Sequence, residues 1–254
     1  MKQHARRPHP YLIQVWDIFC IELTNWRWSW RQIVMIGTVT PLIGMLGFSI
    51  FARDSGPVAL QYVWSGNVVI GLLFGLQNNI ASHFVYLRLE GALSYFATLP
   101  IKKPALLIAI ISAFLLLNLP SILATIFIGA WMLGINIQPS WHLIFIIPLC
   151  AIPMAGIGAF IGSRARNYQE AGAINLAIML LMTALGPVVI PPDRLPNFMI
   201  TLGRFSPATY AASALRGGLL ADLDSSIWME LGVLMLFSLV VITSVNWALD
   251  WRER

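Results

Sequence analysis

Residues 105–130, ALLIAIISAFLLLNLPSILATIFIGA, decide the fold class of this chain. The stretch holds no Asp, Glu, Lys or Arg and is longer than the about 20 apolar residues that carry an α-helix across a bilayer. Its length predicts that this helix tilts or protrudes. Other apolar runs of spanning length lie at 32–51, 61–82, 141–162, 171–190 and 227–249. The sequence therefore predicts an all-α membrane protein with six transmembrane helices, built as a single domain over residues 1–254.

The overall composition agrees with a protein embedded in a lipid bilayer. The chain is 58% hydrophobic and 11% charged, with ten Trp, whereas an average soluble domain has about 25% charged residues. The net charge of +5 does not indicate nucleic-acid binding, because the basic residues are spread along the connections between spans. Most Lys and Arg fall at the two termini and in the connections 83–104 and 163–170. The positive-inside rule then places both termini in the cytoplasm.

The segment just before the opening run is amphipathic: residues 86–104 read YLRLEGALSYFATLPIKKP. Its apolar side chains at 89, 92, 93, 96 and 99 share one helical face, and Pro100 would end the helix. We expect a helix over 86–99 at the cytoplasmic surface. Two interpretations stay open, a helix that rests on lipid headgroups or one that receives a partner protein.

Two further segments differ from plain spans. Residues 10–31 predict a helix in the cytoplasmic interface, with an aromatic and basic anchor of Trp26, Trp28 and Trp30 beside Arg27 and Arg31. This helix is either a membrane anchor or part of a surface that binds a partner protein. Residues 187–226 are interrupted by prolines, so we expect one or two short helices there, forming a re-entrant hairpin over 191–222 that dips into the outer leaflet.

No catalytic motif is apparent. The sequence lacks a GxxxxGKS/T nucleotide-binding loop, a GxSxG elbow and an HExxH zinc motif, and its four His show no ligand spacing. We therefore expect no enzyme activity, cofactor or metal on this chain. The middles of the predicted spans carry no charged residue, which argues against an ion-coupled carrier. Energy for any transport would have to come from outside the membrane.

Two predicted spans carry a face of small and polar residues at helical spacing. These residues are Asn67, Gly71, Gly75, Asn78 and Ser82 on the second span, and Gly172, Asn175, Met179, Thr183 and Gly186 on the fifth. Such residues let helices approach closely and form hydrogen bonds. They are either ordinary packing contacts within one bundle or the lining of a conduit at a subunit interface.

Four patches, in this order, resemble the membrane permease subunits of ABC-2 type exporters. They are Glu90-Gly91-Ala92-Leu93 through Leu99-Pro100-Ile101-Lys102-Lys103; GAFIGSRARNYQE at 158–170; Gly186-Pro187 with the prolines from Pro191 to Pro196; and Phe205-Ser206-Pro207-Ala208-Thr209-Tyr210-Ala211 to Leu215-Arg216. The last patch is the most specific. Leu99 separates Thr98 from Pro100, and Ser206 stands where Asn is common, so the subfamily, and with it the substrate, stays open.

The resemblance implies a permease that works with two ATPase subunits, which hold ATP and Mg, and with a second permease copy, identical or paralogous. It implies a coupling helix over 86–99 seated in the ATPase, a conduit lined by the second and fifth spans, and an outer hairpin that caps it. The coupling residues would be Arg88, Glu90, Gly91, Leu93 and Phe96; the conduit residues Asn67, Gly71, Gly75, Asn78, Asn175, Met179 and Thr183; the hairpin residues Pro191, Pro196, Pro207, Tyr210 and Arg216.

The mostly apolar conduit faces favour an amphipathic or hydrophobic substrate, namely a drug, a lipid or a lipid-linked glycan. The expected location is a bacterial inner membrane, with a plastid or thylakoid membrane as the other option. A non-transport scaffold or assembly protein is the alternative function, followed by a secondary carrier.

Overall fold

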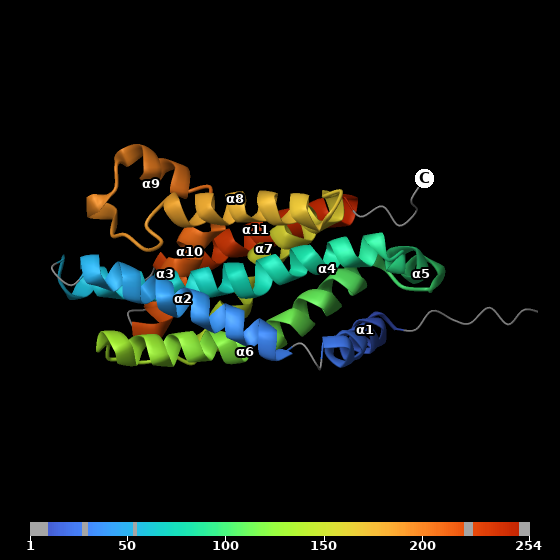
Figure 1. The fold of residues 1–254 in the computed structure, drawn as a ribbon, viewed down its shortest axis with the longest axis horizontal. Helices are drawn as coiled ribbons and strands as arrows, with labels where there is room; N and C mark the ends of the chain where they lie inside the picture. Colours follow the sequence, from blue (N-terminus) through green and yellow to red (C-terminus); the bar gives the residue numbers. More distant parts are fainter. Residues whose placement is uncertain (1–9, 27–29, 53–54, 221–225, 249–254) are drawn as a thin grey trace, which may run out of the picture.

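The computed structural model describes residues 10–26, 30–52, 55–220 and 226–248, and within these ranges it contains helices and no strands. Most of the long helices run side by side along the long axis of the molecule (Figure 1). Five helices are long and apolar enough to cross a membrane: Trp30–Ala52 (α2), Pro57–Leu89, Lys103–Leu133 (α6), Leu143–Arg164 (α7) and Ile227–Ala248 within α11 (Ser226–Ala248). The chain is therefore an all-helical, multi-pass membrane protein.

The predicted span 171–190 is replaced by a shorter helix, α8, which covers Tyr168–Ala184 and has 17 residues. At 1.5 Å per residue this is about 25 Å, less than the about 30 Å of a hydrocarbon core. The helix cannot continue smoothly, because Gly186 adopts a φ of +91°. Since α8 still runs along the bundle (Figure 1), a sixth crossing that includes residues beyond Ala184 stays a prediction.

The second predicted span, 61–82, is part of a longer helical unit. It comprises α3 (Pro57–Leu72), a π-helical turn η2 (Leu73–Gln77) and α4 (Asn78–Leu89), which together give 33 continuous helical residues. A π turn inserts an extra residue into the helix and reorients the side chains that follow it. The side chains before and after η2 therefore face different neighbours.

The prediction of one helix over 86–99 is wrong. Residues 86–89 are the last turn of α4, and a separate short helix, α5 (Ala92–Thr98), follows. Gly91 lies between them with a φ of +69°, a left-handed conformation that glycine adopts without steric cost. The apolar periodicity continues across Gly91, which is why the sequence pattern concealed the break.

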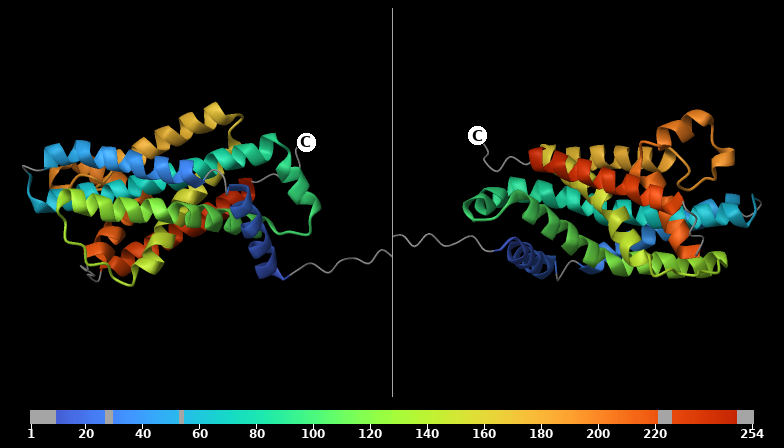
Figure 2. Two further views of the ribbon diagram at one scale, coloured as in Figure 1. Left: turned by 60° about the horizontal axis from the view of Figure 1, so that its bottom comes forward. Right: turned by 180° about the vertical axis from the view of Figure 1, so that it is seen from behind.

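The N-terminal helix α1 covers Tyr11–Trp26, and α2 begins at Trp30, so the predicted helix 10–31 is too long. Trp28 and Arg27 of the predicted anchor lie outside the described residues. The helix lies steeply across one end of the bundle (Figure 2). Its buried side chains are Gln14, Ile18 and Glu22, whereas Leu12 and Trp16 are exposed.

The chain reverses direction at two ends, which we call the α5 end and the α9 end. The α5 end holds α1, the α4–α5 connection, the α7–α8 connection and the last turn of α11, while η3 (Pro192–Arg194) and α9 (Asn197–Gly203) lie at the opposite end (Figures 1 and 2). The helix α10 (Pro207–Leu220) packs against α3, α7 and α11. Short helices thus occupy the region predicted as the outer hairpin, and their depth in a membrane stays a prediction.

Candidate functional site

The turn between α4 and α5 lies at the α5 end of the bundle (Figure 1). Leu89 and Tyr95 are 50% and 64% exposed, and Glu90 and Gly91 between them are exposed as well. This surface, Leu89–Glu90–Gly91–Tyr95, is what a protein at this end would meet.

The side chains of two predicted coupling residues face the interior of the bundle instead of the exposed surface. Leu93 and Phe96 are buried in the hydrophobic core of the chain, so their side chains hold α5 onto the bundle instead of facing outward. Arg88 donates a hydrogen bond to the Ser163 carbonyl at the end of α7, at 3.2 Å. The predicted coupling residues therefore divide into an exposed pair, Glu90 and Gly91, and three residues that fix α4 and α5 to the rest of the chain.

A buried amide network joins η2 and α4 to α8. The Gln77 Nε2 donates to Asn175 Oδ1 at 2.9 Å, and Asn175 Nδ2 donates to Asn78 Oδ1 at 3.0 Å. The same Nδ2 lies 3.1 Å from the sulfur of Met179. Asn78, Asn175 and Met179, predicted from two separate spans, are thus brought together, with Gln77 as an additional member.

Three other predicted conduit residues lie elsewhere, on what we call the glycine face of α3 and η2: Asn67, Gly71 and Gly75. A Cβ on Gly71 would lie 3.4 Å from the Gly37 carbonyl of α2, and one on Gly75 would collide with the Asn118 side chain of α6. All three residues are buried within this one chain. In this structure the glycine face therefore makes helix-packing contacts.

Thr183 belongs to neither group. Its hydroxyl donates only to carbonyls of its own helix, those of Met179 and Leu180, both at 3.0 Å. It is partly exposed on α8, so it is placed on the same helix as the amide network without joining it.

At the α9 side of the bundle, Arg216 of α10 lies over α3. Its Nε donates to Ser65 Oγ at 3.1 Å, and its guanidinium carbon lies 3.4 Å from the ring centroid of Tyr62. On the neighbouring helix turn, Ser213 donates to the Glu230 carboxylate of α11. A cation stacked on an aromatic ring within a membrane protein helps to fix the helices that carry the two groups.

The remaining hairpin residues mark the starts of short helices or close a loop. Pro191 precedes η3, Pro196 precedes α9, and Pro207 is the first residue of α10. The Tyr210 hydroxyl donates to the Arg204 carbonyl at 3.0 Å, which closes the α9–α10 connection. Proline suits these positions because its missing N–H is not needed in the first turn of a helix.

The sequence analysis missed a buried hydrogen-bonded pair between α1 and α4, formed by His83 and Glu22. The Nε2 of His83 lies 3.1 Å from the Glu22 carboxylate, and the two residues are 5% and 1% exposed. The rings of Trp26 and Phe114 pack around His83, with centroids 5.7 and 5.2 Å from it. The available signal was the row Gln14, Ile18 and Glu22 at intervals of four, which is the face of α1 that is buried.

Among the residues that the structure describes, no group of three or more His, Cys, Asp or Glu side chains is arranged to hold a metal ion. The Glu22–His83 pair, the amide network and Arg216 instead connect helices to one another.

A family model described as ABC-2 type transporter matches residues 13–220 of the chain. The chain belongs to the ABC-2 type transporter family. The match begins in α1 and ends with the last residue of α10, so it includes the α4–α5 turn, the amide network and Arg216. No individual curated protein matches the chain in sequence. An ABC-2 membrane domain is the transmembrane permease component of a transporter and is not itself an ATPase domain, and the chain is a multi-pass membrane protein of this kind.

Proposed function

We propose that this ABC-2 chain is the permease half of an ATP-driven exporter, with two cytoplasmic ATPase subunits and a second permease copy completing the complex. The family match over 13–220 carries the proposal. The exposed surface Leu89–Glu90–Gly91–Tyr95 supports it, since it offers a docking point at the end of the bundle. ATP and Mg would be held by the ATPase subunits, because the sequence has no GxxxxGKS/T loop.

Force from the ATPase would enter through α5. The buried Leu93 and Phe96 connect α5 to the core, and Arg88 connects the end of α4 to α7. The Glu22–His83 pair connects α4 to α1. A displacement of α5 would therefore move α4, α1 and the end of α7 together, and the π turn η2 is the place where α4 could bend relative to α3.

The substrate path would run along the amide network between α4 and α8, at or near the contact with the second permease. The surrounding side chains are largely apolar, which suits an amphipathic or hydrophobic substrate such as a drug, a lipid or a lipid-linked glycan. The α5 end would face the cytoplasm, with both termini on that side, in a bacterial inner membrane or a plastid membrane. The hairpin with α9 and α10 would cap the path outside.

Gentle-detergent purification of the tagged chain from its native membrane tests the proposal. We expect a stoichiometric partner whose sequence contains GxxxxGKS/T. Tyr95→Ala combined with Leu89→Ala should release this partner, while Phe205→Ala should retain it, because Phe205 is 77% exposed but lies at the far end of the bundle. A preparation without any ATPase, reproduced after crosslinking, would reject the exporter and favour a scaffold or assembly protein.

A further inference from the structure

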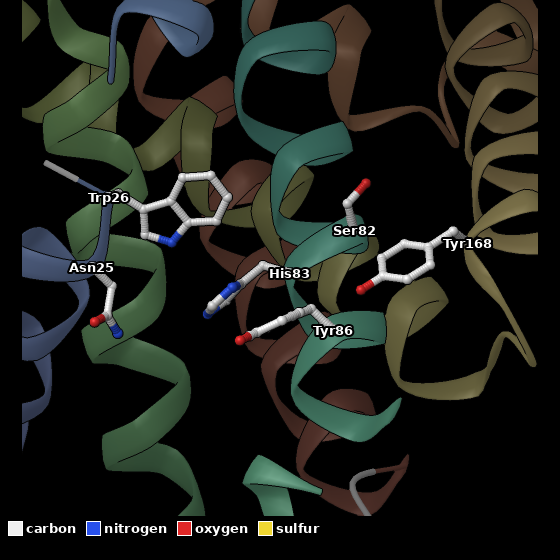
Figure 3. Close-up of a pocket in the computed structure, with 6 residues that line it drawn as sticks. All are labelled: Asn25, Trp26, Ser82, His83, Tyr86 and Tyr168. Carbon is white, nitrogen blue, oxygen red and sulfur yellow. The ribbon is translucent and has the colours of Figure 1, made fainter. Parts of the chain in front are cut away.

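A groove of about 480 Å³ lies between the last turn of α1, α4 and the first residue of α8. Figure 3 shows its lining: Asn25 and Trp26 on one side, His83 and Tyr86 with Ser82 from α4 across the middle, and Tyr168 on the other side. The two tyrosines are each 48% exposed, so the groove opens to the surroundings of the protein. It is separate from the amide network, which lies farther along α4.

One buried polar atom in the lining has no partner. The Nδ1 of His83 makes no hydrogen bond in the described part of the chain, although the residue is 5% exposed. The other nitrogen, Nε2, lies against the Glu22 carboxylate at 3.1–3.2 Å. When the ring is neutral, the carboxylate fixes its hydrogen on Nε2, and Nδ1 is then a hydrogen-bond acceptor. A buried acceptor without a donor favours a ligand that supplies one.

The charges around the groove favour a cation. Among the described residues, no Lys or Arg side chain lines it, and the nearby Arg88 is directed to the Ser163 carbonyl. The α4–α5 connection, which carries Glu90, lies at the same end of the bundle as Tyr168. Burial, the Glu90 carboxylate and Tyr86 raise the pKa of Tyr168. Glu22 supplies a second carboxylate behind the His83 ring.

The aromatic rings add a second attraction for a positive charge. Trp26 and Tyr86 lie on either side of His83, with ring centroids 5.7 and 6.2 Å from it. The negative face of an aromatic ring attracts an ammonium group within about 6 Å. Rings and a single directed acceptor together define a site for a positively charged nitrogen that also carries a hydrogen.

We propose that the α1–α4–α8 groove binds the protonated amine of a lipophilic organic cation. The ammonium N–H donates to His83 Nδ1, the rings of Trp26 and Tyr86 contact the charge, and the apolar part of the molecule extends into the lipid. A role of the groove as the first binding site of an exported substrate rests on the proposed function. The binding of an organic cation in the groove does not.

The test uses the full chain in phosphatidylcholine nanodiscs without an ATPase, at neutral pH. The probe is tritium-labelled dodecyldimethylamine, whose protonated head group has one N–H, and binding to empty nanodiscs is subtracted. We expect saturable binding at one site per chain. Dodecyltrimethylammonium has the same charge and tail but no N–H, and should bind about ten-fold more weakly. Equal binding of the two cations, no saturable binding, or displacement by neutral dodecyl maltoside would overturn the assignment.

Substitutions in and outside the groove test whether the amine binds there. Trp26→Ala should weaken the binding about ten-fold, whereas Trp16→Ala should leave it unchanged, because Trp16 is 64% exposed on α1 outside the groove. His83→Phe keeps a ring but removes Nδ1 and should abolish the preference for the tertiary amine. If this variant fails to fold with Glu22 unpaired, the double variant Glu22→Leu, His83→Phe tests the same point. A preserved preference in a folded variant would contradict the proposal. Failure of the exporter function would appear separately, as the absence of an ATPase partner.

Discussion

The two halves of the helical unit Pro57–Leu89 carry similar residues but use them differently. Up to the middle of η2, Asn67, Gly71 and Gly75 lie in close contact with α2 and α6. From the last residue of this turn, Gln77 and then Asn78 form hydrogen bonds with Asn175 of α8. Both halves carry small and polar residues, so the difference comes from which helix lies opposite. Close packing needs a missing side chain, while a network needs matched donors and acceptors.

The largest expected effect comes from filling the glycine face. Gly75→Leu would drive its side chain into Asn118, so we expect destabilisation by about 3 kcal/mol or more. Thermal unfolding of the chain in nanodiscs measures this. Gly232→Leu in α11 is the matched control, because nothing lies within 4 Å of a Cβ at that position. Equal unfolding temperatures for the two variants would refute close packing at Gly75.

A smaller effect is expected in the amide network. Asn175→Leu leaves the Gln77 and Asn78 side chains without their partner, which should cost about 2 kcal/mol of stability. The double variant Gln77→Leu, Asn175→Leu removes both ends of one hydrogen bond and should recover part of this loss in the same unfolding assay. If the double variant loses the sum of the two single losses, the two amides are not coupled and the network does not act as a unit.

The smallest effect is expected at Thr183. Its hydroxyl bonds only to carbonyls of α8, so Thr183→Val should change stability by less than about 0.5 kcal/mol. The decisive comparison is transport by a reconstituted complex. Unchanged export would separate Thr183 from the substrate path, while a clear loss of export with normal stability would restore its predicted role in the conduit.

The long apolar runs predicted most of the fold. The runs 105–130, 141–162 and 227–249 correspond to Lys103–Leu133, Leu143–Arg164 and Ser226–Ala248, with ends shifted by a few residues. Hydrophobicity over about 20 residues is a strong signal, because a bilayer allows few other solutions. The run 171–190 was less informative, since its apolar character continues past the point where α8 ends at Ala184.

The site was predicted less completely, for reasons that lie in single residues. The break at Gly91 leaves the apolar periodicity of the segment intact, and only its φ of +69° reveals it. Glu22 and His83 are 61 positions apart, and nothing in either local pattern indicates the other. Asn78 and Asn175 were both selected by residue type, but which amide bonds which depends on helix rotation after η2. The spacing of residues predicts which side chains share one face of a helix, but it does not predict which helix packs against that face.

Site-specific photocrosslinking in intact membranes tests whether an ATPase docks on the α4–α5 turn. Benzoylphenylalanine replaces the exposed Tyr95, and in a separate control it replaces the exposed Phe205 at the opposite end. If an ATPase docks there, we expect a single major crosslink from position 95, to a protein that contains GxxxxGKS/T, and none to that protein from position 205. A chain that crosslinks to no ATPase from position 95, or equally from both positions, would contradict it.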